Sequence, residues 1–236
     1  MAVDNPYPGE RARDGLLHAL VGAAIETVPI IGPAVSGLSN EMMRQAQVRR
    51  VEEWAAMVNA RLAVLERAGL AADVTDPEFL AAVARLHRAA SETADDEKRF
   101  LLASVAASSG SSMTQPYVRR AEYVELVTAL SPAEIAVLSY CDDIRVPEGL
   151  EVDTSVGFGV SYGRISLLIN GNEIDIRGWI EAATGVPTDD AWRMYMAMST
   201  RGLLADPRAQ SFDGPMQRFT TDFGHDFLEF LRTCVR

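Results

Sequence analysis

The stretch NEMMRQAQVRRVEEWAAMVNARLAVLERAG, residues 40–69, carries the clearest pattern in the chain. Its apolar residues recur at alternating spacings of four and three, at Val51, Ala55, Val58, Leu62 and Leu65. This spacing places them on one face of an α-helix, while charged residues fill the other faces. Ser39 or Asn40 can cap the start of the helix, and Gly69 can end it. The pattern predicts a long helix that packs against other helices.

Three more helices are predicted after it. Asp76 and Pro77 form a cap and first-turn pair for a helix to about residue 90. The inward residues of this helix are expected to be Phe79, Leu80, Val83 and Leu86. Thr93 is expected to cap the next helix, which has an acidic first turn and ends at Gly110. A fourth helix is expected over 118–130, so residues 39–130 form a helical domain.

The second domain is expected to be residues 131–236, where the sequence changes character. Ser131 and Glu134 form a capping box. AsnGly at 170–171 and AspGly at 213–214 are typical of β-hairpins. Two helices, capped by Asp175 and Thr188, lie between them, and a helix closes the chain. This order indicates a winged helix. We therefore expect a mostly α fold, with an N-terminal helical bundle followed by a small winged-helix-like α+β domain.

Residues 1–38 form an apolar, proline-broken leader segment. LLHALVGAAIETVPIIGPAVSGL, residues 16–38, is nearly long enough to span a bilayer, but Pro29 and Pro33 interrupt helical hydrogen bonding. Two interpretations stay open: the segment is a buried helical hairpin or a cover for a partner surface, or it inserts into a membrane conditionally. The candidate contacts for a membrane or a partner are Val28, Pro29, Ile30, Ile31 and Pro33. A secretory cleavage pattern is lacking, so we expect a cytoplasmic protein that associates with the membrane only on activation.

The sequence shows no catalytic motif. His18, His87 and His225 stand alone, and Cys141 and Cys234 lack metal-binding spacing. GlyPheGlyValSerTyrGly, residues 157–163, lacks the lysine and the following helix of a phosphate-binding loop. We therefore expect a protein that is not an enzyme and that uses no cofactor and no metal.

The charge balance disfavours nucleic acid as a partner. The net charge is −11, and residues 131–236 carry 9 basic against 16 acidic side chains. Asp189 and Asp190 open the helix that would read DNA, where they would face phosphates. The candidate DNA contacts are Arg193, Arg201, Arg208 and Arg218. A winged-helix DNA-binding transcriptional regulator is accordingly the alternative function, behind one that acts through protein contacts.

Four segments within about residues 97–231 resemble the abortive-infection alpha family of uncharacterised bacterial proteins. They are EKRFLLASVAA at 97–107, YVELVTALSPAEIAVL at 123–138, WRMYMAMSTRGLL at 192–204 and TDFGHDFLEF at 221–230. The central hairpin region and the leader have no counterpart in this resemblance. The resemblance implies helices followed by a winged-helix-like end and a role in phage defence, and the family offers no catalytic residues to carry over.

The sequence as a whole favours a non-enzymatic bacterial defence or stress-response protein that acts through protein contacts. A partner protein or self-association is expected, and a membrane is the further partner if the leader segment inserts.

Overall fold

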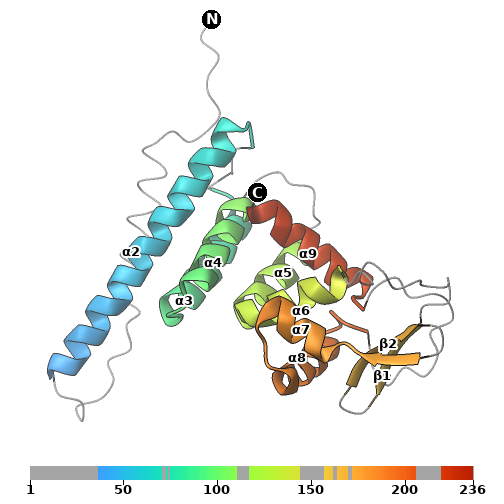
Figure 1. Ribbon diagram of the computed structural model, residues 1–236. Coiled ribbons are helices and arrows are strands. Elements are labelled where there is room, and N and C mark those ends of the chain that lie inside the picture. Colours follow the sequence, from blue (N-terminus) through green and yellow to red (C-terminus); the bar gives the residue numbers. More distant parts are fainter. Residues whose placement is uncertain are drawn as a thin grey trace, which may run out of the picture. The chain divides into compact units, whose positions relative to one another are not determined.

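The computed structural model is mostly helical, as the sequence predicts (Figure 1). The chain divides into two compact units: the first runs to Ala129 and includes Thr233–Arg236, and the second is Leu130–Arg232. The structure describes residues 37–70, 73, 75–110, 117–143, 157–161, 164–169, 172–205 and 219–235.

The first unit begins with the long helix that the sequence predicts, α2, which spans Gly37–Arg67. The predicted cap at Ser39 or Asn40 is wrong, because both residues lie inside the helix. The stripe predicted on it is confirmed, because all five of its residues are buried: Val51, Ala55, Val58, Leu62 and Leu65. Gly69 ends the helix as predicted. Its φ is 77°, in the left-handed region, and its N–H donates to the Glu66 carbonyl at 3.0 Å.

The next helix, α3, spans Pro77–Glu92, and the Asp76 carboxylate caps it by accepting a hydrogen bond from the Glu78 N–H. The inward face is confirmed for three of its predicted residues, which are Phe79, Val83 and Leu86. Leu80 is 41% exposed, so its prediction is wrong. Successive helical residues turn by about 100°, which carries Leu80 beyond the edge of the stripe that Phe79 begins.

Helix α4, Asp96–Ser109, packs against α2, α3 and α5, which spans Tyr117–Ala129. All residues from Leu102 to Ser109 are buried, and most of them are alanine or serine. Small side chains on every side let the axes of neighbouring helices approach closely. Figure 1 shows α4 running beside α3 and α2 within this unit.

The prediction that Thr93 caps α4 is wrong. The N-cap residue is Asp95, whose carboxylate accepts a hydrogen bond from the Lys98 N–H at 3.0 Å. Thr93 belongs to the end of α3, where its N–H donates to the Ala89 carbonyl at 3.1 Å. Its hydroxyl also accepts a hydrogen bond from the Asp95 N–H. The end of α3 and the start of α4 lie within three residues of each other. The C-cap of α3 and the N-cap of α4 are therefore two different residues, Thr93 and Asp95.

The second unit opens with α6, Pro132–Asp142, which starts with the predicted capping box of Ser131 and Glu134. An antiparallel sheet follows, with its strands in chain order: β1 is Gly157–Ser161, β2 is Arg164–Ile169 and β3 is Asn172–Asp175. Ile169 pairs with Asn172 across β2 and β3. The chain therefore reverses where the sequence predicts a hairpin.

Two helices follow the sheet, α7 at Arg177–Thr184 and α8 at Thr188–Thr200, and both pack against α6. Gly185 ends α7 with a φ of 73°, as predicted. Leu138, Ile180 and Tyr195, one from each of these helices, are fully buried. The last helix, α9, spans Asp222–Val235.

The predicted caps of α7 and α8 are each displaced by one residue. The N-cap residue of α7 is Ile176, although the Asp175 carboxylate does accept a hydrogen bond from the first helical N–H. The N-cap residue of α8 is Pro187, and Thr188 is the first helical residue. The Thr188 hydroxyl is unavailable as a cap because it donates to the Glu181 carboxylate.

Two predicted elements lie outside the described residues. One is the hairpin around Asp213 and Gly214; the residues described on either side of it, Leu204 and Thr220, form an isolated antiparallel bridge. The other is the proline-broken part of the leader. The winged-helix arrangement of the second unit therefore stays a prediction.

Gly224, in the first turn of α9, lies against the backbone of Leu203. A Cβ at this position would be 2.1 Å from the Leu203 carbonyl oxygen. We expect Gly224→Ala to lower the free energy of unfolding of the second unit by about 1–3 kcal/mol, because the obstacle is backbone. The matched control is Gly178→Ala in α7, where an added Cβ meets nothing within 4 Å. Urea unfolding followed by tryptophan fluorescence compares them, and equal stability of the two variants would contradict the packing.

Candidate functional site

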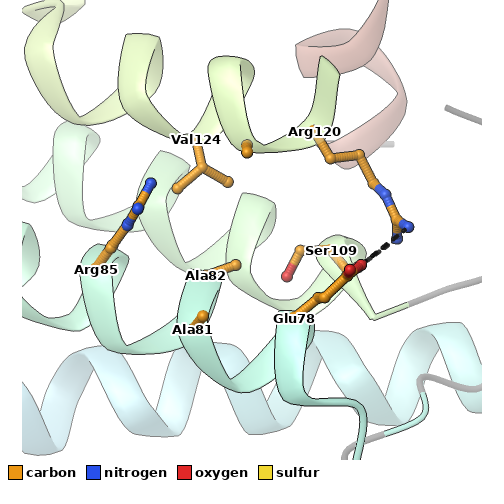
Figure 2. Close-up of a pocket in the computed structure, with 8 residues that line it drawn as sticks. Glu78, Ala81, Ala82, Arg85, Ser109, Arg120 and Val124 are labelled. Atoms are coloured by element: carbon orange, nitrogen blue, oxygen red, sulfur yellow. Dashed lines mark hydrogen bonds and ion pairs between the residues drawn. The ribbon is translucent and has the colours of Figure 1, made fainter. Parts of the chain in front are cut away.

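A cavity of about 70 Å³ opens between α3 and α5, beside the end of α4 in the first unit (Figure 2). Its lining combines a small apolar wall with charged and polar groups around it. The lining residues are Glu78, Ala81, Ala82, Arg85, Ser109, Arg120, Ala121 and Val124. All of them belong to one compact unit, so the cavity lies within that unit.

The apolar wall exists because both facing helices carry short side chains at the same level. Ala81 and Ala82 come from α3, while Ala121 and Val124 come from α5. A larger residue at any of these positions would fill the space, since protein interiors otherwise pack with few voids. The cavity is thus present because alanine occupies most of these facing positions.

Arg120 is the main polar group of the cavity. Its Nη1 donates to the Ser109 carbonyl at 3.1 Å, and its Nη2 lies 4.0 Å from a carboxylate oxygen of Glu78. Figure 2 shows the two side chains reaching toward each other from α5 and α3. The second distance is too long for a hydrogen bond. The Arg120 Nε is buried and has no hydrogen-bond partner among the described residues.

Arg85 lies at the other end of the cavity from Arg120 (Figure 2). Its Nη1 donates to the Glu125 carboxylate at 3.0 Å, and both side chains are more than half exposed. An exposed pair of this kind contributes only about 0–1 kcal/mol to stability. The two arginines therefore differ: Arg85 has a hydrogen-bonded carboxylate partner, and Arg120 has only a distant one.

The volume limits what the cavity can hold. A buried water needs about 10–15 Å³ of such space, so 70 Å³ accommodates a group of a few heavy atoms. Sites for drug-sized ligands and cofactors are several times larger. The cavity therefore matches one side chain of a partner, or a very small acid, rather than a nucleotide.

A second polar cluster surrounds Asp142, at the end of α6 in the other unit. Its side chain is only 2% exposed. It accepts hydrogen bonds from the Thr220 hydroxyl at 2.6 Å and the His225 Nδ1 at 2.9 Å, and Arg232 lies 3.3 Å away. Burial raises the pKa of Asp142, but the hydrogen bonds of Thr220 and His225 and the nearby positive charges outweigh burial and lower it.

This cluster joins α6 to α9 and to the residues just before α9. An aspartate and histidine pair also occurs in hydrolases, where it activates a nucleophile. Within the described residues, the His225 ring bonds to Asp142 and to no hydroxyl or thiol group. The geometry therefore indicates that the cluster stabilises the second unit by linking α6 to α9.

The two predicted DNA contacts that the structure describes each lie beside an acidic side chain of the protein. Arg193 pairs with Asp190 in the same helix, and Arg201 lies 3.8 Å from Glu134. The other predicted contacts lie outside the described residues. They are Arg208 and Arg218 for DNA, and Val28, Pro29, Ile30, Ile31 and Pro33 in the leader. The structure thus brings none of the described candidates together into a basic surface.

Sequence reasoning missed the residues that form the cavity. Glu78 and Arg120 lie 42 positions apart, and Arg120 shares no motif with its neighbours. The available signal was the alanine pair at 81–82 together with Ala121 near the start of the following helix, since facing small residues leave space between helices. His225 was noted as an isolated histidine, and its partner Asp142 was not foreseen.

The described residues contain no group of histidine, cysteine or acidic side chains that could hold a metal ion. In the same part of the chain, no single helix is long and apolar enough to cross a membrane, although α5 and α6 taken together meet the length and composition required.

Asp142→Asn tests the tie between α6 and α9. The pKa of Asp142 in the folded state is below its ordinary value, so the charged carboxylate stabilises the fold above about pH 4. That contribution is lost as the pH falls through the lowered pKa. We expect the variant to lose about 1–3 kcal/mol at pH 7, and to differ less from the parent protein in acid.

The matched control is Asp143→Asn, whose side chain is 65% exposed and contacts only Arg232 among these groups. Thermal unfolding at pH 7 and pH 3 measures both variants. A stability gap between Asp142→Asn and the parent that stays constant with pH would contradict this account.

Comparison with models of protein families, with curated proteins and with solved structures finds no match to this chain. The resemblance to the abortive-infection alpha family accordingly stays a prediction.

Proposed function

We propose that this protein acts without catalysis, through protein contacts, and that the α3–α5 cavity receives a side chain of its partner. The observation that carries the proposal is the cavity itself: an alanine-lined space flanked by Arg85 and Arg120 (Figure 2). Pockets with an apolar interior and an arginine are typical anchor points of protein interfaces, where one inserted side chain contributes much of the affinity.

Two exposed apolar side chains elsewhere on the first unit are further candidate contacts for a partner. Leu80 on α3 is 41% exposed and Phe100 on α4 is 50% exposed, although both belong to the helices of this unit. Aromatic residues and arginine are enriched at protein interfaces relative to other surfaces. These exposed groups supply apolar area that a partner can cover beyond the cavity.

We further propose that the second unit is a winged-helix-like module used for packing or protein contact. Support comes from the order of its elements: α6, the sheet, α7, α8, the Leu204–Thr220 bridge and α9. In such a module α8 would be the recognition helix, and its first turn carries Asp189 and Asp190. These carboxylates would repel a DNA backbone, which favours protein over nucleic acid as the partner.

The proposed biological setting is bacterial defence or stress response. Its support is the sequence resemblance over residues 97–231, which implies a role in phage defence. Conditional membrane insertion of residues 16–38 belongs to the same proposal and rests on their apolar, proline-broken sequence. A cytoplasmic resting protein with a sheltered leader fits both parts.

Site-specific photocrosslinking in the host cells tests the proposed contact. A photoreactive residue replaces Ala84, which is exposed on α3 one turn from the cavity residue Ala81. We expect one discrete adduct with a defined protein, which mass spectrometry identifies. The same residue at Glu52, exposed on α2, should not give this adduct.

Filling the cavity provides the second arm of this experiment. Ala82→Leu adds a branched side chain to the cavity wall and should remove the adduct while the helical circular dichroism and thermal unfolding stay close to those of the parent. If the adduct is absent from Ala84, appears equally at Glu52, or persists in folded Ala82→Leu protein, the cavity is not the partner site.

A further inference from the structure

The hydrogen bonding of Arg120 is incomplete in a way that indicates what enters the cavity. Its Nη1 has an acceptor in the Ser109 carbonyl, while its Nε is buried with no acceptor among the described residues. A buried donor without a partner is destabilising. The Nη2 group also lacks a hydrogen-bonded acceptor in the described part of the chain, because the Glu78 carboxylate lies 4.0 Å from it, and a ligand oxygen in the cavity can supply one. The requirement is for an acceptor, and a charged one suits a guanidinium best.

We propose that the cavity binds the carboxylate of a glutamate or aspartate side chain of the partner protein, and that Glu78 holds its place in the unbound state. This inference rests on the proposed use of the cavity as a partner site. It adds the chemistry of the inserted group and names the residue that competes with it.

Glu78 has the properties of such a competitor. Its carboxylate lies 4.0 Å from the Arg120 Nη2, so it neutralises the guanidinium without a hydrogen bond (Figure 2). Its side chain is 43% exposed and sits in the first turn of α3. A long, half-exposed side chain can rotate into water at little cost. The incoming carboxylate then takes the position beside Arg120.

The charges and walls of the cavity select against other occupants. Glu125 already neutralises Arg85, whereas a lysine or arginine would be repelled by Arg120 and has no acceptor to offer it. The alanine and valine wall contacts the short methylene stem of an acidic side chain. A planar carboxylate can accept two parallel hydrogen bonds from a guanidinium, a geometry that phosphate shares but with a bulkier, more highly charged group.

The probe is propionate, which carries a carboxylate on the short stem of an acidic side chain. It is titrated into the full-length protein while NMR follows the Arg120 Nε–H resonance, assigned by its loss in Arg120→Gln. We expect a saturable shift with propionate. Propanol and butylammonium should give none, and inorganic phosphate should bind at least about tenfold more weakly than propionate.

Two substitutions should move propionate affinity in opposite directions. Glu78→Gln removes the competing charge and should tighten binding by about three- to tenfold, whereas Arg120→Gln should weaken it by at least about tenfold. Methyl resonances of Ala82 and Ala121 report binding where the arginine signal is lost. The control is Arg88→Gln, since Arg88 lies on α3 outside the cavity lining and already pairs with Glu92. Its affinity should change less than twofold.

The outcomes separate this inference from the proposed function. If propanol binds as well as propionate, if phosphate binds more tightly, or if Glu78→Gln has no effect, the inference is overturned. The crosslinking result alone then decides whether the cavity is a partner site. If Ala82→Leu abolishes the crosslink while Arg120→Gln leaves it intact, the partner inserts a neutral side chain and the acidic occupant is again excluded.

Discussion

Burial of the second half of α4, Leu102–Ser109, on all sides is the constraint on which the first unit depends. A helix surrounded by α2, α3 and α5 must be small in cross-section, and the run from Leu102 to Ser109 meets this need with alanine and serine. Two cations near the start of α4, Lys98 and Arg99, are buried as well. Lys98 donates to the Val127 carbonyl near the end of α5, where a cation is favourable, and Arg99 pairs with Asp96 and Glu53. These contacts fix the helices that border the cavity.

The elements that the sequence predicts correctly are those with local causes. Helix caps at Asp76 and Ser131, the ends at Gly69 and Gly185 and the stripe on α2 all follow from periodicity or from the hydrogen bonding of a single side chain. The predictions that Thr93 and Thr188 are N-cap residues are wrong, because Asp95 and Pro187 hold these positions. Competition between adjacent caps depends on how the chain enters the helix, which the sequence does not express.

The candidate site was beyond sequence reasoning for a different reason. A cavity is defined by which residues of two helices come level with each other, and that register is set by packing on α4. Ala82 and Ala121 are ordinary helix residues when read in sequence, and Arg120 becomes notable only when its donors are counted in three dimensions. Asp142 and His225, 83 positions apart, are brought together in the same way by the packing of the second unit.

Amide hydrogen exchange of the full-length protein tests most directly whether α4 is the centre of the first unit. Exchange of buried helical amides requires the opening of the surrounding helices, so protection reports how deeply a helix is enclosed. The account predicts that peptides covering residues 102–109 exchange most slowly in this unit, well behind those covering 42–50 of α2, where Met42 and Met43 are exposed. Exchange of residues 102–109 as rapid as that of residues 42–50 would contradict it.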